Sequence, residues 1–340
     1  MKEIAAVFFE RPPLFVQVSD PVHAGSFLQE SPMSARLFQF WNWVIELVDR
    51  RGLDRRELSR RLGLKDKQSL RVSRDYTTFR IAKKSGKARQ ISAPNSELKE
   101  LQRRILRRVL ARLNPHPLAT GFRKGVSFVD NARIHQSQSV IVKIDLVNFF
   151  PAIKREKVMR YFRQIGWNRA TTRLLADLTT FEDALPQGAP TSPALSNLVN
   201  FSLDLRIAKL VSNQGGIYTR YADDITISFS QSQIVNLKPL IAIVFSVIRE
   251  TGYEPHLGKK FNVRRSHQRQ VVNGLVVNDR ANLPRETRRW LRAVRHRAEI
   301  FQRGGYLVAP PTLTRNQLAG WRALQIMIER GQGRVPSPSE

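Results

Sequence analysis

Two strand-like segments that each bring an aspartate to one end restrict what this chain can fold into. Val140–Asp145 (VIVKID) is a β-rich run that closes on an acid. Ile217–Phe229 (IYTRYADDITISF) has the pattern of two short strands around a turn, which predicts a hairpin with Asp223 and Asp224 at its tip. A single aspartate in such a place is usually a turn former. Two adjacent acids at the tip of an apolar hairpin repel each other, and this favours a bound cation.

The three acidic side chains suggest a divalent metal and phosphoryl transfer. Mg²⁺ prefers oxygen ligands and is usually held by one or two carboxylates together with substrate phosphates. If Asp145 meets the hairpin tip, two ions about 4 Å apart could be bridged there, which is the arrangement used for in-line phosphoryl transfer. Asp145 and Asp223 lie 78 residues apart, so their meeting is a hypothesis that spacing alone does not test.

A third segment, residues 185–193 (LPQGAPTSP), lies between these acids. Ser192 is a suitable N-cap and Pro193 suits the first helical position, so a long helix is expected from Pro193 to about Val211. The segment has two interpretations. It is either an ordinary loop before a helix, or a glycine loop whose backbone approaches a ligand while Gln187 presents its amide.

The charge of the chain indicates a polyanionic partner. Its 57 Lys and Arg against 28 Asp and Glu give a formal net charge of +29, and the isoelectric point is about 11.4. Such a surface attracts nucleic acid or an anionic membrane, but no apolar run approaches the ~20 residues of a spanning helix. The N-terminal run is too short for a secretory signal, so we expect a cytoplasmic protein that binds nucleic acid and no membrane. The absence of cysteine excludes disulfides, zinc ribbons and thiol catalysis.

The positive charge is concentrated in two blocks that flank a less charged middle. Residues 50–112 hold 21 Lys and Arg against 6 Asp and Glu, and within them Glu97–Leu113 has the pattern of an amphipathic helix. Residues 285–334 hold 11 against 3 and predict two helices, Arg285–Arg303 and Thr314–Arg330, the second capped by its threonine. A basic face with so few carboxylate partners can simply be solvated, but it favours binding to a phosphate backbone.

Taken together and in this order, these segments resemble reverse transcriptases. The aspartate that closes a strand, the LPQG-x-x-x-SP loop and the YADD hairpin are similar to motifs A, B and C of the polymerase palm. Upstream, Phe79–Pro94 (FRIAKKSGKARQISAP) is similar to the fingers motif of the same enzymes. The resemblance implies that Lys83 or Lys84, together with Arg89, holds the triphosphate of the incoming nucleotide.

Two further segments narrow the resemblance to bacterial retron reverse transcriptases. Residues 131–135 (NARIH) match the NAxxH signature of that group, which makes Asn131 and His135 candidates for contacts with RNA or with the scaffold. Residues 272–274 (VNG) stand where the group has Val-Thr-Gly, so that Asn273 replaces threonine before Gly274. Asparagine keeps the polarity of threonine, but the difference leaves intron-type, diversity-generating and abortive-infection reverse transcriptases as alternatives.

The resemblance implies an α+β fold, the right-hand polymerase with fingers, a palm built on an antiparallel sheet, and a helical thumb. We expect an N-terminal helical extension over residues 1–74, fingers over 75–138, a palm over 139–280, a thumb over 281–330 and a disordered tail over 331–340.

The resemblance also implies roles for the site residues, with Mg²⁺ as cofactor. Asp145 and Asp223 would bind both metal ions, with the carbonyl of Leu146 assisting and Asp224 as the third carboxylate. The remaining residues would contact the nucleotide, primer or RNA: Phe150 as an aromatic gate that clashes with a ribose 2′-OH, Gln187 and Gly188 in the nucleotide pocket, Tyr221 at the primer end, and Asn131, His135, Asn273 and Gly274 near the RNA.

The implied reaction is RNA-templated synthesis of DNA from deoxynucleotides. Resemblance to retrons further implies a cognate structured non-coding RNA and priming from a guanosine 2′-OH, which gives a branched RNA–DNA product (msDNA). It also implies an effector protein in anti-phage defence. A non-catalytic RNA-binding protein that keeps the polymerase fold is the alternative from another class, and the intact acids speak against it.

Overall fold

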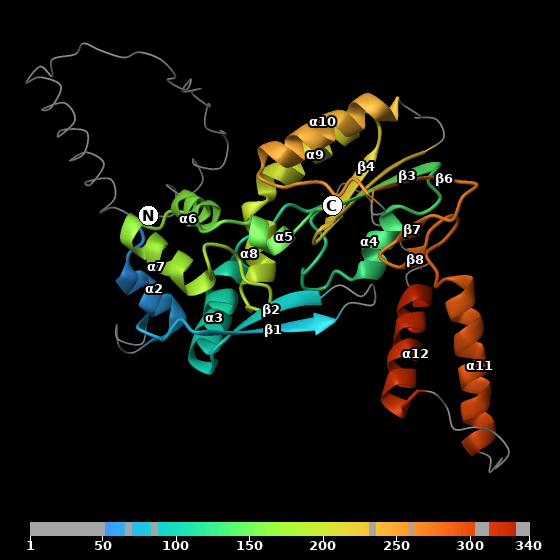
Figure 1. The fold of residues 1–340 in the computed structure, drawn as a ribbon, viewed down its shortest axis with the longest axis horizontal. Helices are drawn as coiled ribbons and strands as arrows, with labels where there is room; N and C mark the ends of the chain where they lie inside the picture. The colour runs from blue at the N-terminus through green and yellow to red at the C-terminus, as the bar shows by residue number, and fades with distance from the viewer. Residues whose placement is uncertain are drawn as a thin grey trace, which may run out of the picture. The chain divides into compact units, whose positions relative to one another are not determined.

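The computed structural model describes residues 52–64, 70–82, 88–230, 236–258, 261–302 and 313–330 (Figure 1). The chain divides into two units, residues 1–49 and 50–340, and all described residues belong to the second. The predicted tail and the two candidate nucleotide-binding lysines, Lys83 and Lys84, lie outside the described residues.

The centre of the described unit is a four-stranded antiparallel sheet in the order β4-β5-β3-β6. Its strands are β3 (Val140–Asp145), β4 (Ile217–Tyr221), β5 (Asp224–Phe229) and β6 (Asn262–Arg265). The strands β3 and β5 are almost entirely buried, as expected for runs rich in β-branched residues that are covered by helices. The strand and hairpin predicted from the acidic segments are therefore confirmed.

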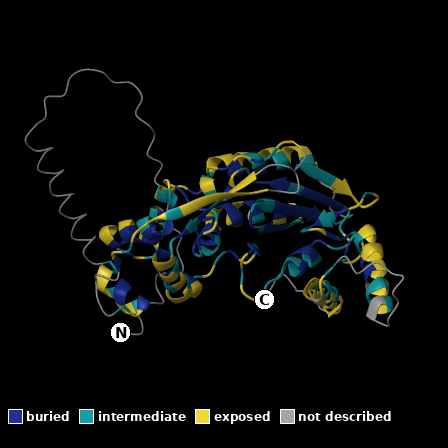
Figure 2. Ribbon diagram, turned by 60° about the horizontal axis from the view of Figure 1, so that its bottom comes forward, coloured by how far each residue is buried: buried dark blue, intermediate teal, exposed yellow. Residues whose placement is uncertain are grey.

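Most of the helices share one main core with this sheet, and the last two helices belong to a second core. Their bounds are α2 (Arg55–Leu62), α3 (Ser96–Arg108), the 3₁₀ turn η2 (Leu110–Arg112), α4 (Phe128–Ile134), α5 (Phe149–Ala152), α6 (Arg155–Gln164), α7 (Arg169–Thr179), α8 (Ser192–Val199), α9 (Phe201–Ser212), α10 (Leu237–Glu250), α11 (Arg285–Gln302) and α12 (Arg315–Arg330). Figure 2 shows the buried residues gathered in the sheet and on the helix faces turned toward it. No described helix is long and apolar enough to cross a membrane.

The helix expected from Pro193 to Val211 is broken into α8 and α9, so that part of the prediction is wrong. The break lies at Asn200, whose side-chain amide donates 2.8 Å to the carbonyl of Ser196. A side chain that bonds to the backbone one turn earlier competes with the helical hydrogen bonds and ends or bends the helix. Ser192 is the first residue of α8 and Thr191 is the N-cap, without a side-chain capping bond.

Two smaller hairpins complete the described elements. Strands β1 (Tyr76–Ala82) and β2 (Ala88–Pro94) pair antiparallel, and most of their residues are exposed. Strands β7 (Val271–Val272) and β8 (Leu275–Val276) flank a two-residue turn at Asn273 and Gly274. Both turn residues have positive φ, 49° and 83°, which is the geometry of a type I′ turn and strongly favours Asn-Gly. Asparagine at position 273 thus has a local structural reason.

The predicted basic helices of the C-terminal block are confirmed as α11 and α12. A capping box holds the start of α12, because Thr314 Oγ1 accepts from the Gln317 amide at 3.3 Å and Gln317 Oε1 accepts from the Thr314 amide at 2.9 Å. The two helices share a second apolar core with α4 and β7–β8. Arg133 joins α4 to α12 by donating 2.7 Å to the carbonyl of Met327.

Candidate active site

The sheet brings the three acidic residues together at one end of its two central strands. Asp145, the last residue of β3, is the register partner of Asp224, the first residue of β5. Directly opposed residues of an antiparallel pair have Cβ atoms about 4.5–5.5 Å apart on the same face. Leu146 follows Asp145, and Asp223 precedes Asp224. The Leu146 amide donates 2.9 Å to the carbonyl of Asp223, so a hydrogen bond joins the two segments just beyond the paired strands. The hypothesis that Asp145 meets the hairpin tip is confirmed.

The turn that carries these acids is tight and enclosed. Ala222 has φ +58°, in the left-handed region, and is almost fully buried. Gly121 packs against this turn so closely that a Cβ on it would lie 2.7 Å from the Ala222 amide nitrogen. Asp145 is only 8% exposed, whereas Asp223 and Asp224 are half-buried and reach the surface.

The donor set fits a divalent ion whose shell is completed by substrate. Within the described ranges, no three acidic, histidine or cysteine side chains are already gathered as a metal cage. Mg²⁺ seldom uses such a cage, because it is usually held by one or two carboxylates, waters and substrate phosphates. Asp145 and Asp224 across the strand pair, with Asp223 beside them, supply hard oxygen donors of the right kind.

An aromatic cluster lies beside the acids. The Phe150 ring centroid is 6.1 Å from that of Phe122, which in turn is 6.5 Å from that of Tyr221. Phe149 also belongs to the cluster, with its ring centroid 5.3 Å from that of Phe150. Phe122 was not predicted as a site residue. In the structure its side chain is 47% exposed and its φ is 62°, in the left-handed region. The structure therefore places Phe150 and Tyr221 near one another, with Phe122 between them.

The LPQG loop makes its close approach to a strand of the β1–β2 hairpin. The carbonyl of Gln187 accepts from the Ser92 amide at 2.8 Å. Gly188 has φ +132°, and a Cβ there would lie 2.8 Å from the Ser92 carbonyl oxygen and 2.9 Å from Ile91 Cγ2. Glycine is thus required by the strand. Arg89 lies three residues before Ser92 on the same strand, β2, and is exposed. It therefore belongs to the strand that the LPQG loop contacts.

The NAxxH residues are buried, and the expectation that they contact RNA directly is wrong. His135 is fully buried and bridges the two strands of the acidic hairpin, with Nδ1 at 2.7 Å from Ser228 Oγ and Nε2 at 2.8 Å from Thr219 Oγ1. Burial lowers the pKa of His135 to about 3, which keeps the ring neutral. Asn131 is also fully buried and accepts from Thr120 Oγ1 at 2.8 Å. The alternative reading, contact with the scaffold, is what the structure shows.

A buried polar cluster behind the acidic turn also escaped the sequence analysis. Its centre is an ion pair between Arg220 on β4 and Asp204 on α9, in which both side chains are fully buried. Burial acts to lower the pKa of Arg220, but the Asp204 carboxylate outweighs it and raises that pKa. Burial also lowers the pKa of Lys157, at the rim of this cluster, to about 8. The signal available in the sequence was Arg220, a charged residue within a hairpin predicted to be apolar.

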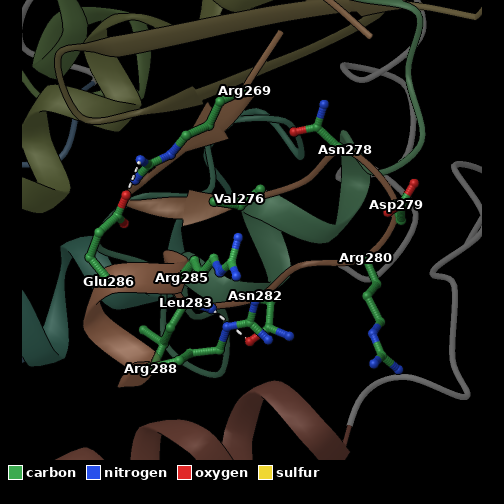
Figure 3. A pocket seen from close by; sticks show the side chains of 10 residues that line it. All are labelled: Arg269, Val276, Asn278, Asp279, Arg280, Asn282, Leu283, Arg285, Glu286 and Arg288. Carbon is green, nitrogen blue, oxygen red and sulfur yellow. Dashed lines mark hydrogen bonds and ion pairs between the residues drawn. The ribbon is translucent and has the colours of Figure 1, made fainter. Parts of the chain in front are cut away.

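A basic pocket lies where the β7–β8 hairpin meets the start of α11 (Figure 3). Its volume is about 390 Å³, and the charged residues that line it are four arginines and two acids: Arg269, Arg280, Arg285, Arg288, Asp279 and Glu286. Arg269 is paired with Glu286 at 3.1 Å. Arginine guanidinium groups bind phosphate through planar, bidentate hydrogen bonds, so this pocket suits a nucleic-acid backbone.

The sheet geometry and the acid-bearing turn define the palm of a right-hand polymerase. Comparison with known proteins identifies the family. Residues 81–272 match the family described as reverse transcriptase (RNA-dependent DNA polymerase). The chain therefore belongs to the reverse transcriptases, and its relatives place it among those of retrons.

Three relatives illustrate the similarity. The retron Ec86 reverse transcriptase of Escherichia coli is 36% identical over 225 residues, which cover 65% of this chain and 69% of the relative. The retron Mx162 reverse transcriptase of Myxococcus xanthus is 36% identical, with 65% of this chain and 52% of the relative covered. The retron Ec83 reverse transcriptase of Escherichia coli is 31% identical, with 65% and 75% covered. The chain thus spans about half the length of the Mx162 enzyme and about two thirds or more of the other two.

A solved structure of a foamy viral protease–reverse transcriptase in complex with double-stranded DNA is also similar. It is 20% identical with a TM-score of 0.38, and the match covers 64% of this chain and 32% of the other.

Proposed function

We propose that this chain is an RNA-directed DNA polymerase of the retron type, which copies a structured non-coding RNA into DNA. The observation that carries the proposal is the register that sets Asp145 opposite Asp224 and bonds Leu146 to Asp223. It places hard oxygen donors together at one end of the two central strands, inside the region that matches the reverse transcriptase family.

The chain's own residues would hold the reactants as follows. Asp145, Asp223 and Asp224, with the Leu146 carbonyl, would hold Mg²⁺. Bound there with substrate phosphates, Mg²⁺ would activate the attacking hydroxyl and neutralise charge on the transferred phosphoryl group. The primer end would lie beside Tyr221.

The nucleotide would bind between the palm and the β1–β2 hairpin. Arg89, with Lys83 or Lys84, would hold its triphosphate, since arginine forks and lysine point charges both bind phosphate. Gln187 and Gly188 tie this hairpin to the palm and would line the pocket. A rigid Phe150 ring under the sugar would clash with a ribose 2′-OH and select deoxynucleotides.

Nucleic acid would be held by the two basic blocks. We propose that residues 75–138 act as fingers, 139–280 as palm and 281–330 as thumb, with residues 1–74 as an extension. The arginine pocket at the base of α11 supports backbone binding in the thumb, where Asn273 and Gly274 form the neighbouring turn. Priming from a guanosine 2′-OH, an effector protein partner, a role in anti-phage defence and a cytoplasmic location complete the proposal, and these four points rest on the resemblance to retron reverse transcriptases alone.

The experiment is to purify nucleic acid bound to the protein expressed from its native locus, and to treat it with RNase and a 2′,5′-debranching enzyme. Two variants are compared with the unchanged protein. Asp223→Asn removes one site carboxylate, and Glu156→Gln removes an exposed carboxylate from α6 as the matched control.

A DNA species that needs Asp223, persists in Glu156→Gln and shifts on debranching is the expected result. DNA without a branch would contradict the proposed priming while keeping the polymerase. RNA alone in every sample would contradict the polymerase and favour an RNA-binding protein.

A further inference from the structure

Arg220 lies directly behind the acidic turn, and we propose that it is a positioning residue, fixed by Asp204, that sets the orientation of Asp223. The proposal rests on the polymerase function proposed above, because it concerns how that site is held. Arg220 touches none of the reacting groups. Its effect would pass through the backbone of the turn.

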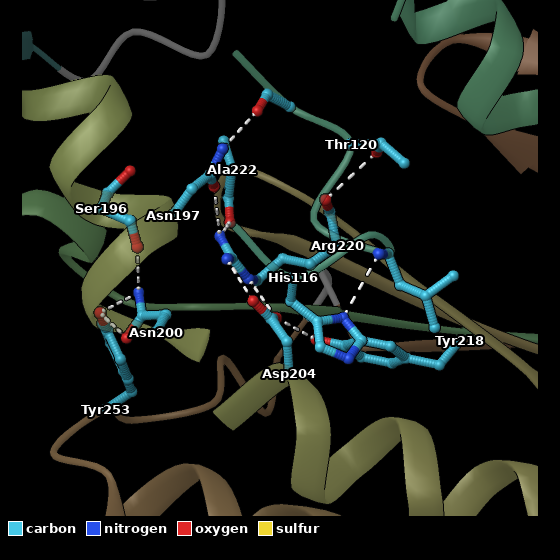
Figure 4. Close-up of polar contacts among 12 residues, drawn as sticks. His116, Thr120, Ser196, Asn197, Asn200, Asp204, Tyr218, Arg220, Ala222 and Tyr253 are labelled. Carbon is cyan, nitrogen blue, oxygen red and sulfur yellow. Dashed lines mark hydrogen bonds and ion pairs between the residues drawn. The ribbon is translucent and has the colours of Figure 1, made fainter. Parts of the chain in front are cut away.

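The Arg220 guanidinium divides its hydrogen bonds between an anchor and the turn (Figure 4). Two bonds of 2.7 Å, from Nε and Nη2, go to the two carboxylate oxygens of Asp204 on α9. Nη1 donates 3.1 Å to the carbonyl of Ala222 and 3.3 Å to Oδ1 of Asn197 on α8. The planar guanidinium therefore fixes the direction of the Ala222 carbonyl relative to two helices.

The Ala222 carbonyl belongs to the peptide plane that leads into Asp223. On the other side of Asp223, the next peptide plane is fixed as well, since the Asp223 carbonyl accepts from the Leu146 amide at 2.9 Å. The Asp223 Cα is thus held between two anchored peptide planes, one tied to Arg220 and one to the strand of Asp145. Ala222 itself has φ +58°, a conformation that a non-glycine residue keeps only when its surroundings impose it.

The two residues that bind the Arg220 guanidinium, Asp204 and Asn197, are held by further hydrogen bonds. Asp204 also accepts 2.7 Å from the Tyr218 hydroxyl, and Asn197 donates 2.6 Å to the carbonyl of Gly121, the residue that packs on the turn. The guanidinium lies 5.7 Å from the centroid of Phe149, which follows the strand of Asp145. The YADD turn, the helix that follows the LPQG segment and the segment that follows Asp145 therefore all contact one buried cation.

Stability alone does not account for this arrangement. A fully buried ion pair is on average no more stabilising than apolar residues of the same volume, because the loss of hydration offsets the attraction between the charges. What apolar residues cannot supply is a directed donor for the Ala222 carbonyl. The pair is therefore separable by experiment into a stability role and a positioning role.

The test replaces the cluster by apolar side chains in the full-length protein. The triple variant Arg220→Met, Asp204→Leu, Tyr218→Phe removes the charges together with the hydroxyl that depends on them. Arg206→Met is the control, since Arg206 lies on the same helix α9 and pairs with Glu250 at the surface. Single-nucleotide extension on an RNA template gives kcat and the KM for dNTP, and filter binding gives the Kd for template–primer.

A displacement of the Asp223 carboxylate by about 1 Å is expected to lower kcat on the order of 10²-fold. The KM for dNTP, the Kd for template–primer and the Tm should stay near those of the control, and hydrogen exchange at the Leu146 amide should accelerate. A folded triple variant whose kcat equals that of the control would overturn the proposal.

Three further outcomes bear on the proposal. If the triple variant does not fold, Arg220→Lys keeps a cation for Asp204 but not the fork that also reaches Ala222, and wild-type kcat in this variant would overturn the proposal. If neither variant folds, the pair serves global stability and the positioning role is refuted. If the unchanged protein extends no primer, the polymerase function fails, while faster exchange at Leu146 in a folded variant still supports the positioning role.

Discussion

His135 makes the stability of this protein depend on pH in a direction that the structure determines. The ring joins β4 to β5 through the hydroxyls of Thr219 and Ser228, and one nitrogen must accept for both bonds to form with a neutral imidazole. Burial lowers its pKa from 6.5 to about 3. Protonation in the folded state would place an unpaired charge in the core.

The magnitude follows from this shift. Below pH 6.5 the unfolded chain takes up a proton at His135 and the folded protein does not, so stability falls as the pH is lowered from about 6.5 toward 3. Stability from this group is fully present above pH 6.5. For one site with these two pKa values, about 2 kcal/mol is lost between pH 8 and pH 5.

The assay is urea unfolding at several values from pH 8 to pH 5, for the unchanged protein and for His135→Gln. Glutamine can donate and accept but does not titrate, so the variant should be about 1–3 kcal/mol less stable at pH 8, because its geometry fits the two hydroxyls less well. The difference between the two proteins should shrink by about 2 kcal/mol at pH 5. A difference that stays constant with pH would refute the neutral, buried state of His135.

Three other substitutions test the loop, the turn and the gate. Gly188→Ala should destabilise the protein by about 1–3 kcal/mol in urea unfolding, because its Cβ would lie 2.8 Å from the Ser92 carbonyl oxygen. Gly320→Ala is the control and should not destabilise the protein, because a Cβ there has no neighbour within 4 Å. Equal effects of the two substitutions would contradict the requirement for glycine at position 188. Asn273→Thr should cost about 1–2 kcal/mol in the same assay, since a β-branched residue is forced to φ +49°; unchanged stability would show that the turn does not select asparagine. Phe150→Val should raise ribonucleotide over deoxynucleotide incorporation in a competition assay, and an unchanged ratio would count against the gate.

The strands and the basic helices could be predicted because local pattern decides them. Val140–Asp145 appears in the structure with the predicted bounds, and the YADD hairpin has its turn at Ala222 and Asp223. Apolar β-branched runs that end in acids admit few alternatives. The start of α12 at Thr314 was predictable for the same kind of reason, since a threonine followed by a glutamine three residues later can form a capping box.

The errors arise where tertiary partners decide. The break at Asn200 depends on a side chain that bonds Ser196 and also the hydroxyl of Tyr253, a partner 53 residues away. The sequence left open what the glycine of the LPQG loop approaches, and the structure shows that Ser92 of β2 is a close neighbour. No pattern within one segment indicates which distant strand will fill the space beside it.

The buried polar groups, Asn131 and His135 among them, gather around one hairpin, and this explains why these two residues are distant from the solvent. An apolar core tolerates small displacements, whereas directed hydrogen bonds fix a register, and a catalytic group must be held within about 0.5 Å. His135 fixes the two strands to each other, and Asn131 holds Thr120, whose amide donates 2.9 Å to the Arg220 carbonyl. His135 and Asn131 thus stabilise the positions of the strands, while the Arg220 side chain stabilises the turn.

These two supports should therefore separate in experiment. Loss of His135 removes bonds that are distant from the peptide planes beside Asp223, so its main effect should be on the free energy of unfolding. Loss of the Arg220 fork frees one of those planes directly, so its main effect should be on kcat at unchanged Tm. If both substitutions lowered kcat equally at pH 8, the hairpin would move as one body, and the distinction between strand support and turn support would be wrong.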